Sequence, residues 1–192
     1  MVIVGGGKPI DGGKNFIDGR RLFGDHKTWR GLILGPLLLG IPISIAVFFI
    51  FIILWPLISP IIETAAEAGQ YQLYTDPSIY QFYFIGGPFP IGVLVLLVRV
   101  IFCSYGAAFG DLIGSCLKRR FNIESGAPFW IVDQLDFAVF SVLFAFIPFV
   151  FFPSLYYIPD LNIFIFLMIL TPAVSIIANT VAYIIGVKNV PW

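Results

Sequence analysis

Long apolar runs alternate with short polar segments along the 192 residues of the chain. A helix needs about 20 consecutive apolar residues to cross a bilayer. Four runs approach or exceed that length, at residues 32–54, 79–109, 137–152 and 163–185. The pattern predicts an all-α integral membrane protein, a bundle of four to five kinked transmembrane helices that forms a single membrane domain over residues 1–192.

Glycine and proline interrupt three of these runs, at residues 35–36, at residues 86–90 and at Pro172. Such breaks are tolerated in membrane helices when neighbouring groups satisfy the freed backbone. In the second run we expect a leading segment, a kink, and then a helix through Arg99 towards Asp111, with two short elements as the alternative. The third run is slightly short, so its helix is expected to begin earlier, within residues 131–136.

Basic residues gather in alternate polar segments. Ten of the eleven Lys and Arg lie in residues 1–31, in the loop at 118–134 or in the C-terminal tail, whereas the loops at 63–78 and 154–162 hold none. The positive-inside rule places the basic segments in the cytoplasm. Four crossings then put both termini inside, and two cytoplasmic polar regions, residues 1–31 and 111–136, face each other.

Composition agrees with this picture. The chain is 59% hydrophobic and 11% charged, with a mean hydropathy of +0.96, whereas a soluble domain has about 25% charged residues. Cys103 and Cys116 are about 20 Å apart along a continuous helix, too far for a disulfide. The sequence shows no Cys/His or Ser/His pairing and no zinc set, and we expect no nucleic-acid partner.

Residues 111–136 gather acids and bases between two oily runs, where charge is costly. Helical spacing puts four polar residues on one face: Asp111, Ser115, Lys118 and Arg119. Asp133 and Asp136 fall in the first turn of the next span, where the helix dipole favours anions. Carboxylates suit Mg²⁺, which binds one or two of them together with substrate phosphates. The alternative is a set of flanking charges with a helix cap.

Residues 1–31 hold eight glycines, six Lys or Arg and three Asp, without helical or strand periodicity. We expect a loop region packed against the membrane. Glycine-rich backbone can wrap a phosphate with N–H groups, while Lys27 and Arg30 neutralise its charge. His26, the only histidine of the chain, is expected to be a solvated loop residue.

Three motifs in this order resemble a known family. Ser115-Cys-Leu-Lys118-Arg119 followed by Asp133-Gln-Leu-Asp136 is similar to the phosphatidate cytidylyltransferase signature, S-x-x-K-R with a later D-R-x-D. Lys27-Thr-Trp-Arg-Gly31 resembles the K-T-W-E-G element of that superfamily, with Arg30 in place of Glu. The whole pattern, including the C-terminal VKNVPW, most closely resembles the archaeal branch, the CDP-archaeol synthases. Members often begin with one further spanning helix, which leaves the total number of spans open.

The resemblance implies a multi-pass enzyme of the cell membrane with its active site on the cytoplasmic side. It implies Mg²⁺-dependent transfer of CMP from CTP to 2,3-bis-O-geranylgeranylglycerol 1-phosphate, which gives CDP-archaeol and pyrophosphate. The implied metal ligands are Asp111, Asp133 and Asp136, which with Lys118 form the catalytic set. The residues expected to bind the nucleotide are Lys27, Thr28, Arg30, Arg119, Asp11 and Asn15.

In the expected mechanism an oxygen of the lipid phosphate attacks the α-phosphorus of CTP directly. The breaks at residues 35–36 and 86–90 are candidates for a lateral slot that admits the isoprenoid chains. Arg99 is a candidate contact for the lipid phosphate or an interface anchor. A small transporter or channel with a cytoplasmic cation site is the alternative, which Arg99 and the broken helices also fit. A homodimer is one candidate assembly.

Overall fold

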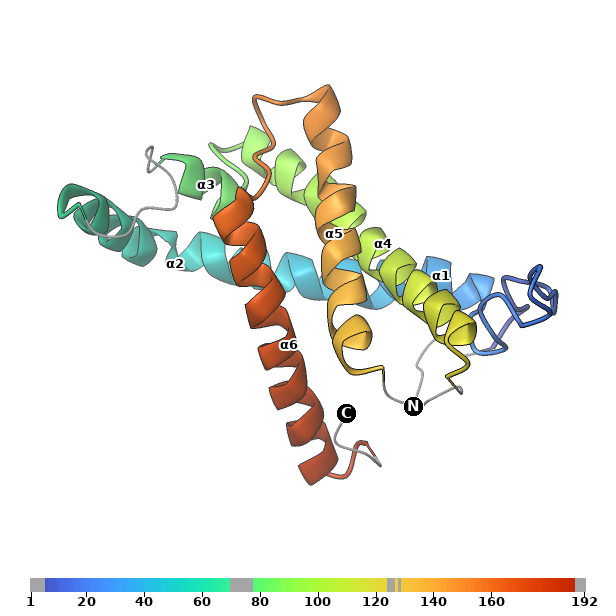
Figure 1. Ribbon diagram of the computed structural model, residues 1–192. Coiled ribbons are helices and arrows are strands. Elements are labelled where there is room, and N and C mark those ends of the chain that lie inside the picture. The colour runs from blue at the N-terminus through green and yellow to red at the C-terminus, as the bar shows by residue number, and fades with distance from the viewer. Residues whose placement is uncertain (1–5, 70–77, 124–126, 128, 189–192) are drawn as a thin grey trace.

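The computed structural model describes residues 6–69, 78–123, 127 and 129–188, in which helices are joined by loops (Figure 1). In chain order the elements are α1 (Trp29–Gly35), the π-helix η1 (Pro36–Gly40), α2 (Ile41–Glu67), α3 (Ser78–Ile85), α4 (Ile91–Arg120), α5 (Trp130–Phe151) and α6 (Leu161–Ile184). Within these residues, four helical stretches are long and apolar enough to cross a membrane: 29–67, 91–120, 132–151 and 161–184. The predicted all-α, multi-pass architecture is confirmed.

The first span is longer than the hydropathy pattern predicted. Gly35 and Pro36 do not break the helix. The backbone changes to a π-helix in η1 and then continues as the α-helix α2. The helix runs to Glu67, so the polar loop expected from Glu63 begins later. Charge ends an apolar run but not the backbone hydrogen bonding of a helix, and Glu and Ala are good helix formers. The loop residues 70–77 lie outside the described residues.

The break at residues 86–90 separates α3 from α4 and resolves the second run into one short and one long helix. Gly86 and Gly87 adopt positive φ angles of 78° and 107°. A Cβ atom on Gly86 would lie 2.3 Å from the carbonyl oxygen of Gly92. Glycine is therefore required at Gly86 for both its conformation and the close approach of α4.

Arg99 holds α3 against α4. Its Nη1 donates to the carbonyl oxygens of Phe82 and Tyr83, at 2.9 and 3.1 Å. These carbonyls belong to the last turn of α3, and that of Phe82 also accepts from the N–H of Gly86. Twelve residues of α4 separate Arg99 from Asp111, which is about 18 Å along the helix axis. Arg99 is thus an anchor for α3 and not a neighbour of the aspartates.

Three glycines spaced four residues apart let α4 and α5 meet closely. A Cβ atom on Gly106 would lie 2.6 Å from the carbonyl oxygen of Phe140, and one on Gly110 would lie 2.4 Å from that of Asp136. Gly114 continues the same face of α4. Small residues at such spacing let helix backbones pack in contact inside membranes. We call this set the glycine stripe, and it sets the distance between α4 and α5.

The polar ends of α4 and α5 also differ in part from expectation. α4 continues to Arg120, so residues 118–120 are helical and not part of the second loop. α5 begins at Trp130, which confirms its predicted early start. Both cysteines lie on α4 as free thiols, as predicted.

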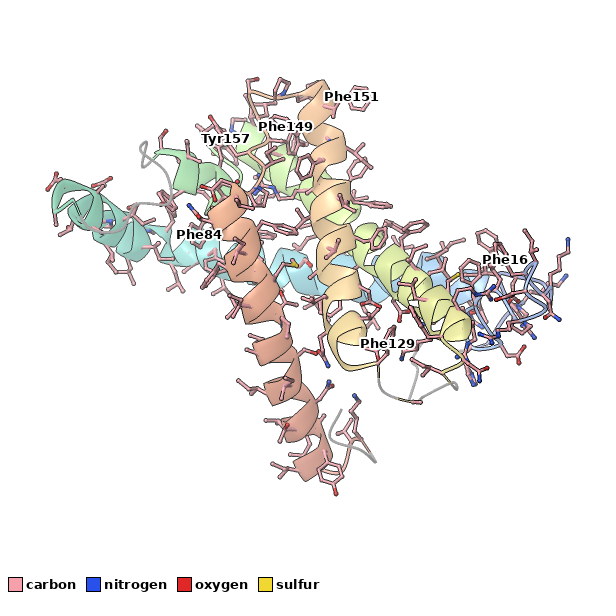
Figure 2. The ribbon with its side chains drawn as sticks, in the orientation of Figure 1. Phe16, Phe84, Phe129, Phe149, Phe151 and Tyr157 are labelled. Carbon is pink, nitrogen blue, oxygen red and sulfur yellow. The ribbon has the colours of Figure 1, made fainter. Side chains whose placement is uncertain are left out.

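The outer helices expose their apolar side chains. None of the side chains in the most apolar windows of 29–67 and 161–184 is buried, and Figure 2 shows side chains projecting outward from α2 and α6. Apolar residues facing outward are what a helix in contact with lipid presents. The central helix is α4, whose inner face carries most of the buried apolar residues: Val95, Leu96, Val100 and Leu112.

The glycine stripe yields the first prediction. Gly110→Ala introduces a methyl group against backbone atoms of α5, so we expect the free energy of unfolding to fall by about 1–3 kcal/mol. Gly35→Ala is the matched control, because a Cβ atom there meets nothing within 4 Å. Thermal unfolding of both variants in detergent measures the difference. Equal stability of the two variants would contradict the tight α4–α5 contact.

Candidate active site at the polar ends of α4 and α5

The N-terminal loop, residues 6–28, folds back on itself before α1 begins. Pro9 and Thr28 form an isolated antiparallel bridge. The backbone N–H of Ile10 donates to the carbonyl oxygen of Lys27 at 2.9 Å. The two ends of the loop are therefore joined, and Lys27 is held at a fixed place beside the start of α1.

Asp11 organises this loop from within. Its side chain is fully buried and accepts hydrogen bonds from Arg21 and from the backbone N–H groups of Gly13, Phe23 and Gly24. Burial alone would raise the pKa of Asp11, but these hydrogen bonds lower it well below its ordinary value. The carboxylate is engaged inside the loop, so Asp11 stabilises the loop, and its contact with the nucleotide stays a prediction.

The loop is fastened to the C-terminal end of α4. Arg120 Nη1 pairs with Asp18 Oδ1 at 2.7 Å, and Arg20 Nη1 donates to the carbonyl oxygen of Arg120 at 2.6 Å. The guanidinium of Arg120 also lies 4.9 Å from the centre of the Phe16 ring, which Figure 2 shows beside that helix end. The two polar regions predicted to face each other are therefore in contact.

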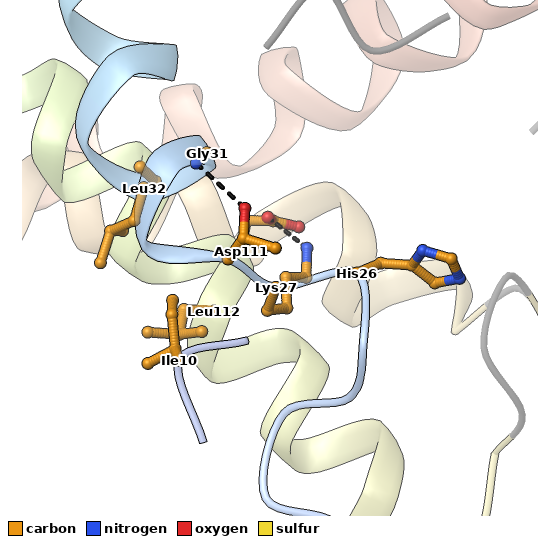
Figure 3. A pocket seen from close by; sticks show the side chains of 9 residues that line it. Ile10, His26, Lys27, Gly31, Leu32, Asp111 and Leu112 are labelled. Carbon is orange, nitrogen blue, oxygen red and sulfur yellow. Dashed lines mark hydrogen bonds and ion pairs between the residues drawn. The ribbon is translucent and has the colours of Figure 1, made fainter. Parts of the chain in front are cut away.

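Lys27 reaches across to α4. Its Nζ forms an ion pair with Oδ2 of Asp111, at the wall of a pocket of about 350 Å³ (Figure 3). Thr28, which is buried, is the N-cap of α1, and its Oγ1 accepts from the N–H of Gly31 at 3.1 Å. The pocket thus combines a lysine and a carboxylate with the first turn of a helix. Its lining residues are Ile10, His26, Lys27, Thr28, Gly31, Leu32, Ala108, Asp111 and Leu112.

A second ion pair joins α4 to α5. Lys118 Nζ lies 2.7 Å from Asp133 Oδ2 and donates to the carbonyl oxygen of Ala127 at 3.2 Å. The same Oδ2 of Asp133 accepts from the N–H of Phe129, the N-cap residue of α5. Asp133 therefore satisfies the start of its own helix and also holds a lysine.

Asp136 lies over the last glycine of the stripe. A Cβ atom on Gly114 would lie 2.0 Å from Asp136 Oδ2, so only glycine leaves this carboxylate room. Its Oδ1 accepts from the N–H of Phe137 at 2.6 Å. The carboxylates of Asp111 and Asp133 are near enough to repel the negative charge of Asp136. The three aspartates thus share one end of the bundle. Within the described ranges, however, no three acidic, His or Cys side chains converge into a preformed metal site.

The remaining predicted residues divide between the site and its periphery. Arg119 packs against the N-terminal loop, because a Cβ atom on Gly24 would lie 3.7 Å from its Nε. That Nε is buried and has no hydrogen-bond partner among the described residues. Arg30 is exposed beside Gly7. Asn15 is exposed and forms an isolated antiparallel bridge with Arg21.

A known protein family matches most of the chain. Residues 1–54 and 70–192 match the model of the CarS-like family, described as CDP-archaeol synthase. The chain belongs to the CDP-archaeol synthase family. The CDP-archaeol synthase of Thermococcus onnurineus is 37% identical over 193 residues, covering 100% of this chain and 86% of the relative. That of Methanococcus aeolicus is 38% identical over 190 residues, covering 99% and 86%.

A solved structure shares the fold. It is described as an intramembrane enzyme for archaeal membrane lipid biosynthesis, with a TM-score of 0.55 and 24% sequence identity over 93% of this chain and 82% of that one. Family membership confirms the predicted resemblance and makes the protein an enzyme, a membrane cytidylyltransferase of archaeal lipid synthesis. The transporter or channel alternative is thereby set aside.

Sequence reasoning missed two features of the site. The fastening of the loop by Asp18, Arg20 and Arg120 carries no local signal, because it joins residues about a hundred positions apart. The glycine stripe did carry a signal, the spacing of Gly106, Gly110 and Gly114 by four residues on one helix face. His26 is exposed, as expected, but it also lines the pocket.

The buried carboxylate of Asp11 yields the second prediction. Asp11→Asn removes the charge that Arg21 and three backbone amides bind, and hydrogen bonds to a charged group contribute about 1.5–3 kcal/mol. We expect hydrogen exchange of the amides of Gly13, Phe23 and Gly24 to accelerate by at least about tenfold, which corresponds to 1.4 kcal/mol. Mass spectrometry of the exchanged peptides measures it.

Asp25→Asn is the matched control, because Asp25 pairs with the same arginine at 2.8 Å but its side chain is 76% exposed. Exposed ion pairs contribute about 0–1 kcal/mol, so exchange in this variant should change little. Similar exchange in the two variants would show that Asp11 does not organise the loop.

Proposed function

We propose that the protein transfers CMP from CTP to 2,3-bis-O-geranylgeranylglycerol 1-phosphate with the help of Mg²⁺, giving a CDP-activated ether lipid and pyrophosphate. The observation that carries the proposal is the meeting of the N-terminal loop with the ends of α4 and α5. There Lys27 pairs with Asp111 and Lys118 pairs with Asp133, Asp136 lies over Gly114 of α4, and Arg119 packs against Gly24 of the N-terminal loop. A triphosphate and its metal need this combination of cations and carboxylates.

The donor set fits a hard divalent cation. Asp111, Asp133 and Asp136 offer carboxylate oxygens, which Mg²⁺ prefers, and the phosphates of the substrate complete its shell. The space over Gly114 that Asp136 Oδ2 occupies is one that a side chain would fill, so this carboxylate has a dedicated place. When bound there, the metal ion neutralises phosphate charge and orients the reacting groups.

The residues of the chain supply positioning and charge. Lys27, which lines the pocket, would hold the triphosphate together with Lys118 and Arg119. A phosphate monoester is largely ionised at neutral pH, since its second pKa is about 6. Its oxygen attacks the α-phosphorus of CTP, the new O–P bond forms as the bond to the β-phosphate oxygen breaks, and pyrophosphate leaves with the electron pair.

An apolar groove offers a place for the isoprenoid chains. It has a volume of about 360 Å³ and lies between α2 and α4 beside the break at residues 86–90; its lining residues are Ile45, Phe48, Phe49, Ile52, Phe89, Val93, Leu96, Leu97 and Val100. Val100 is the groove residue that lies nearest to Asp111 along α4. Eleven positions separate the two, which is about 16 Å along the helix. A lipid whose phosphate sits at the aspartates would extend its chains in this direction.

The membrane orientation is part of the proposal. The basic segments that build the site would face the cytoplasm, in accord with the positive-inside rule and with CTP as a soluble substrate. A homodimer stays a prediction.

The central test is turnover. Purified protein with CTP, Mg²⁺ and the lipid phosphate is expected to release pyrophosphate. Asp133→Asn or Asp136→Asn should lower turnover by at least about a hundredfold, because a bound metal ion contributes several kcal/mol of charge stabilisation. Glu63→Gln, an exposed carboxylate on α2, is the control. Full turnover in both aspartate variants would show that Asp133 and Asp136 are not metal ligands.

The groove yields a separate prediction. Ile52→Trp narrows it, so we expect a higher KM for the lipid phosphate and an unchanged KM for CTP. Ile53→Trp is the matched control, because Ile53 is the next residue on α2, is 60% exposed and does not line the groove. Steady-state kinetics with each substrate varied in turn measures both constants. Equal KM values for the lipid phosphate in the two variants would show that the isoprenoid chains do not bind in this groove.

A further inference from the structure

The two ion pairs of the site share a feature that the proposed function does not explain. In each, the acid is a proposed metal ligand and the base is a proposed ligand of the nucleotide phosphates. Lys27 pairs with Asp111, and Lys118 pairs with Asp133. Each pair joins different segments, since 84 residues separate the first two and the second links α4 to α5.

We infer that Lys27 and Lys118 are internal counter-ions that occupy the metal-ligand carboxylates until the nucleotide arrives, so that metal and nucleotide bind cooperatively. The inference rests on the proposed function and deepens it. It assigns the two lysines a role in the free enzyme in addition to their role towards phosphate.

The geometry makes the lysine and the metal compete for the same carboxylate. Both ammonium groups contact the Oδ2 atom of their carboxylate, and a divalent cation on the same oxygen would face a like charge within a few ångströms. At 4 Å the repulsion between a divalent cation and an ammonium group is about 2 kcal/mol in water and several times larger near a protein surface. A cation can therefore bind with full affinity only when the lysines leave.

The same geometry makes the exchange inexpensive for the Lys27–Asp111 pair, which is more exposed than the Lys118–Asp133 pair, where the two side chains are 15% and 29% exposed. The side chain of Asp111 is 62% exposed and that of Lys27 is 26% exposed, and exposed ion pairs contribute only about 0–1 kcal/mol. A lysine carries its charge on a flexible stem, so its ammonium can turn from the carboxylate to a phosphate without moving the backbone. The triphosphate thus offers the lysines a stronger partner and frees the carboxylates for the metal.

Asp136 differs from the other two. Its Oδ1 accepts from a backbone N–H and its Oδ2 lies over Gly114, and the described residues provide no lysine within ion-pair distance. It is the acid that stays open to a cation in the free enzyme. We therefore expect the metal ion alone to bind weakly, through Asp136. Its affinity should rise strongly once both lysines have moved away from Asp111 and Asp133.

The test measures binding of Mn²⁺ alone, by electron paramagnetic resonance, to the full chain in detergent without nucleotide. Lys27→Gln and Lys118→Gln should each tighten Mn²⁺ binding by at least about fivefold, the lower end of typical coupling between sites. Lys27→Arg keeps a cation beside Asp111 and should bind Mn²⁺ as the wild type does. This conservative variant also separates loss of the ion pair from general damage to the fold.

Lys14→Gln is the matched control, because Lys14 is an exposed lysine of the same loop and its loss changes the net charge equally. Mn²⁺ affinities of Lys27→Gln and Lys118→Gln no higher than that of Lys14→Gln would overturn the inference. Turnover of the wild type, measured in parallel, keeps the two proposals apart. Active wild type with unchanged Mn²⁺ affinity in the variants rejects the counter-ion role alone, whereas tighter binding in an inactive protein rejects the proposed reaction.

Discussion

The close approach of α4 and α5 is the constraint on which the site depends. One aspartate comes from α4 and two come from α5, so their separation is set by the distance between the two helices. That distance is fixed by three positions of α4 that carry no side chain, where a Cβ atom would lie between 2.0 and 2.6 Å from atoms of α5. Inside a membrane, where lipid competes with apolar side chains, such close packing is a main source of helix association.

The N-terminal loop is stabilised in a different way from the helices, because it has few apolar side chains with which to form a core. A buried carboxylate, Asp11, replaces that core and is bound by Arg21 and three backbone amides. Arginine contacts then fasten the loop to the end of α4. This rigid attachment lets Lys27 reach an aspartate on a membrane helix. The loop thus adds to the apolar helices the polar surface to which the proposed function assigns phosphate binding.

The far end of the bundle is organised around the break at residues 86–90. Arg99 satisfies the last carbonyls of α3, and the apolar groove between α2 and α4 begins beside Phe89. The polar chemistry and the groove lie at different depths along the same helix, α4. A lipid with a charged head and long apolar chains needs such a division, because each part is then matched by the protein over its own length.

The sequence by itself determined the number of long apolar spans, the break before α4 and the family of the chain. Hydropathy and glycine conformation are local properties, and the motifs around Lys27, Lys118 and Asp133 occur in a fixed order. It did not determine where α2 and α4 end, because polar residues stop an apolar run without stopping a helix. Only the tertiary structure decided that Asp11 is buried inside the N-terminal loop, that Arg99 binds α3, and which lysine meets which aspartate. Those outcomes depend on contacts between distant segments, and the glycine stripe sets the spacing at which they form.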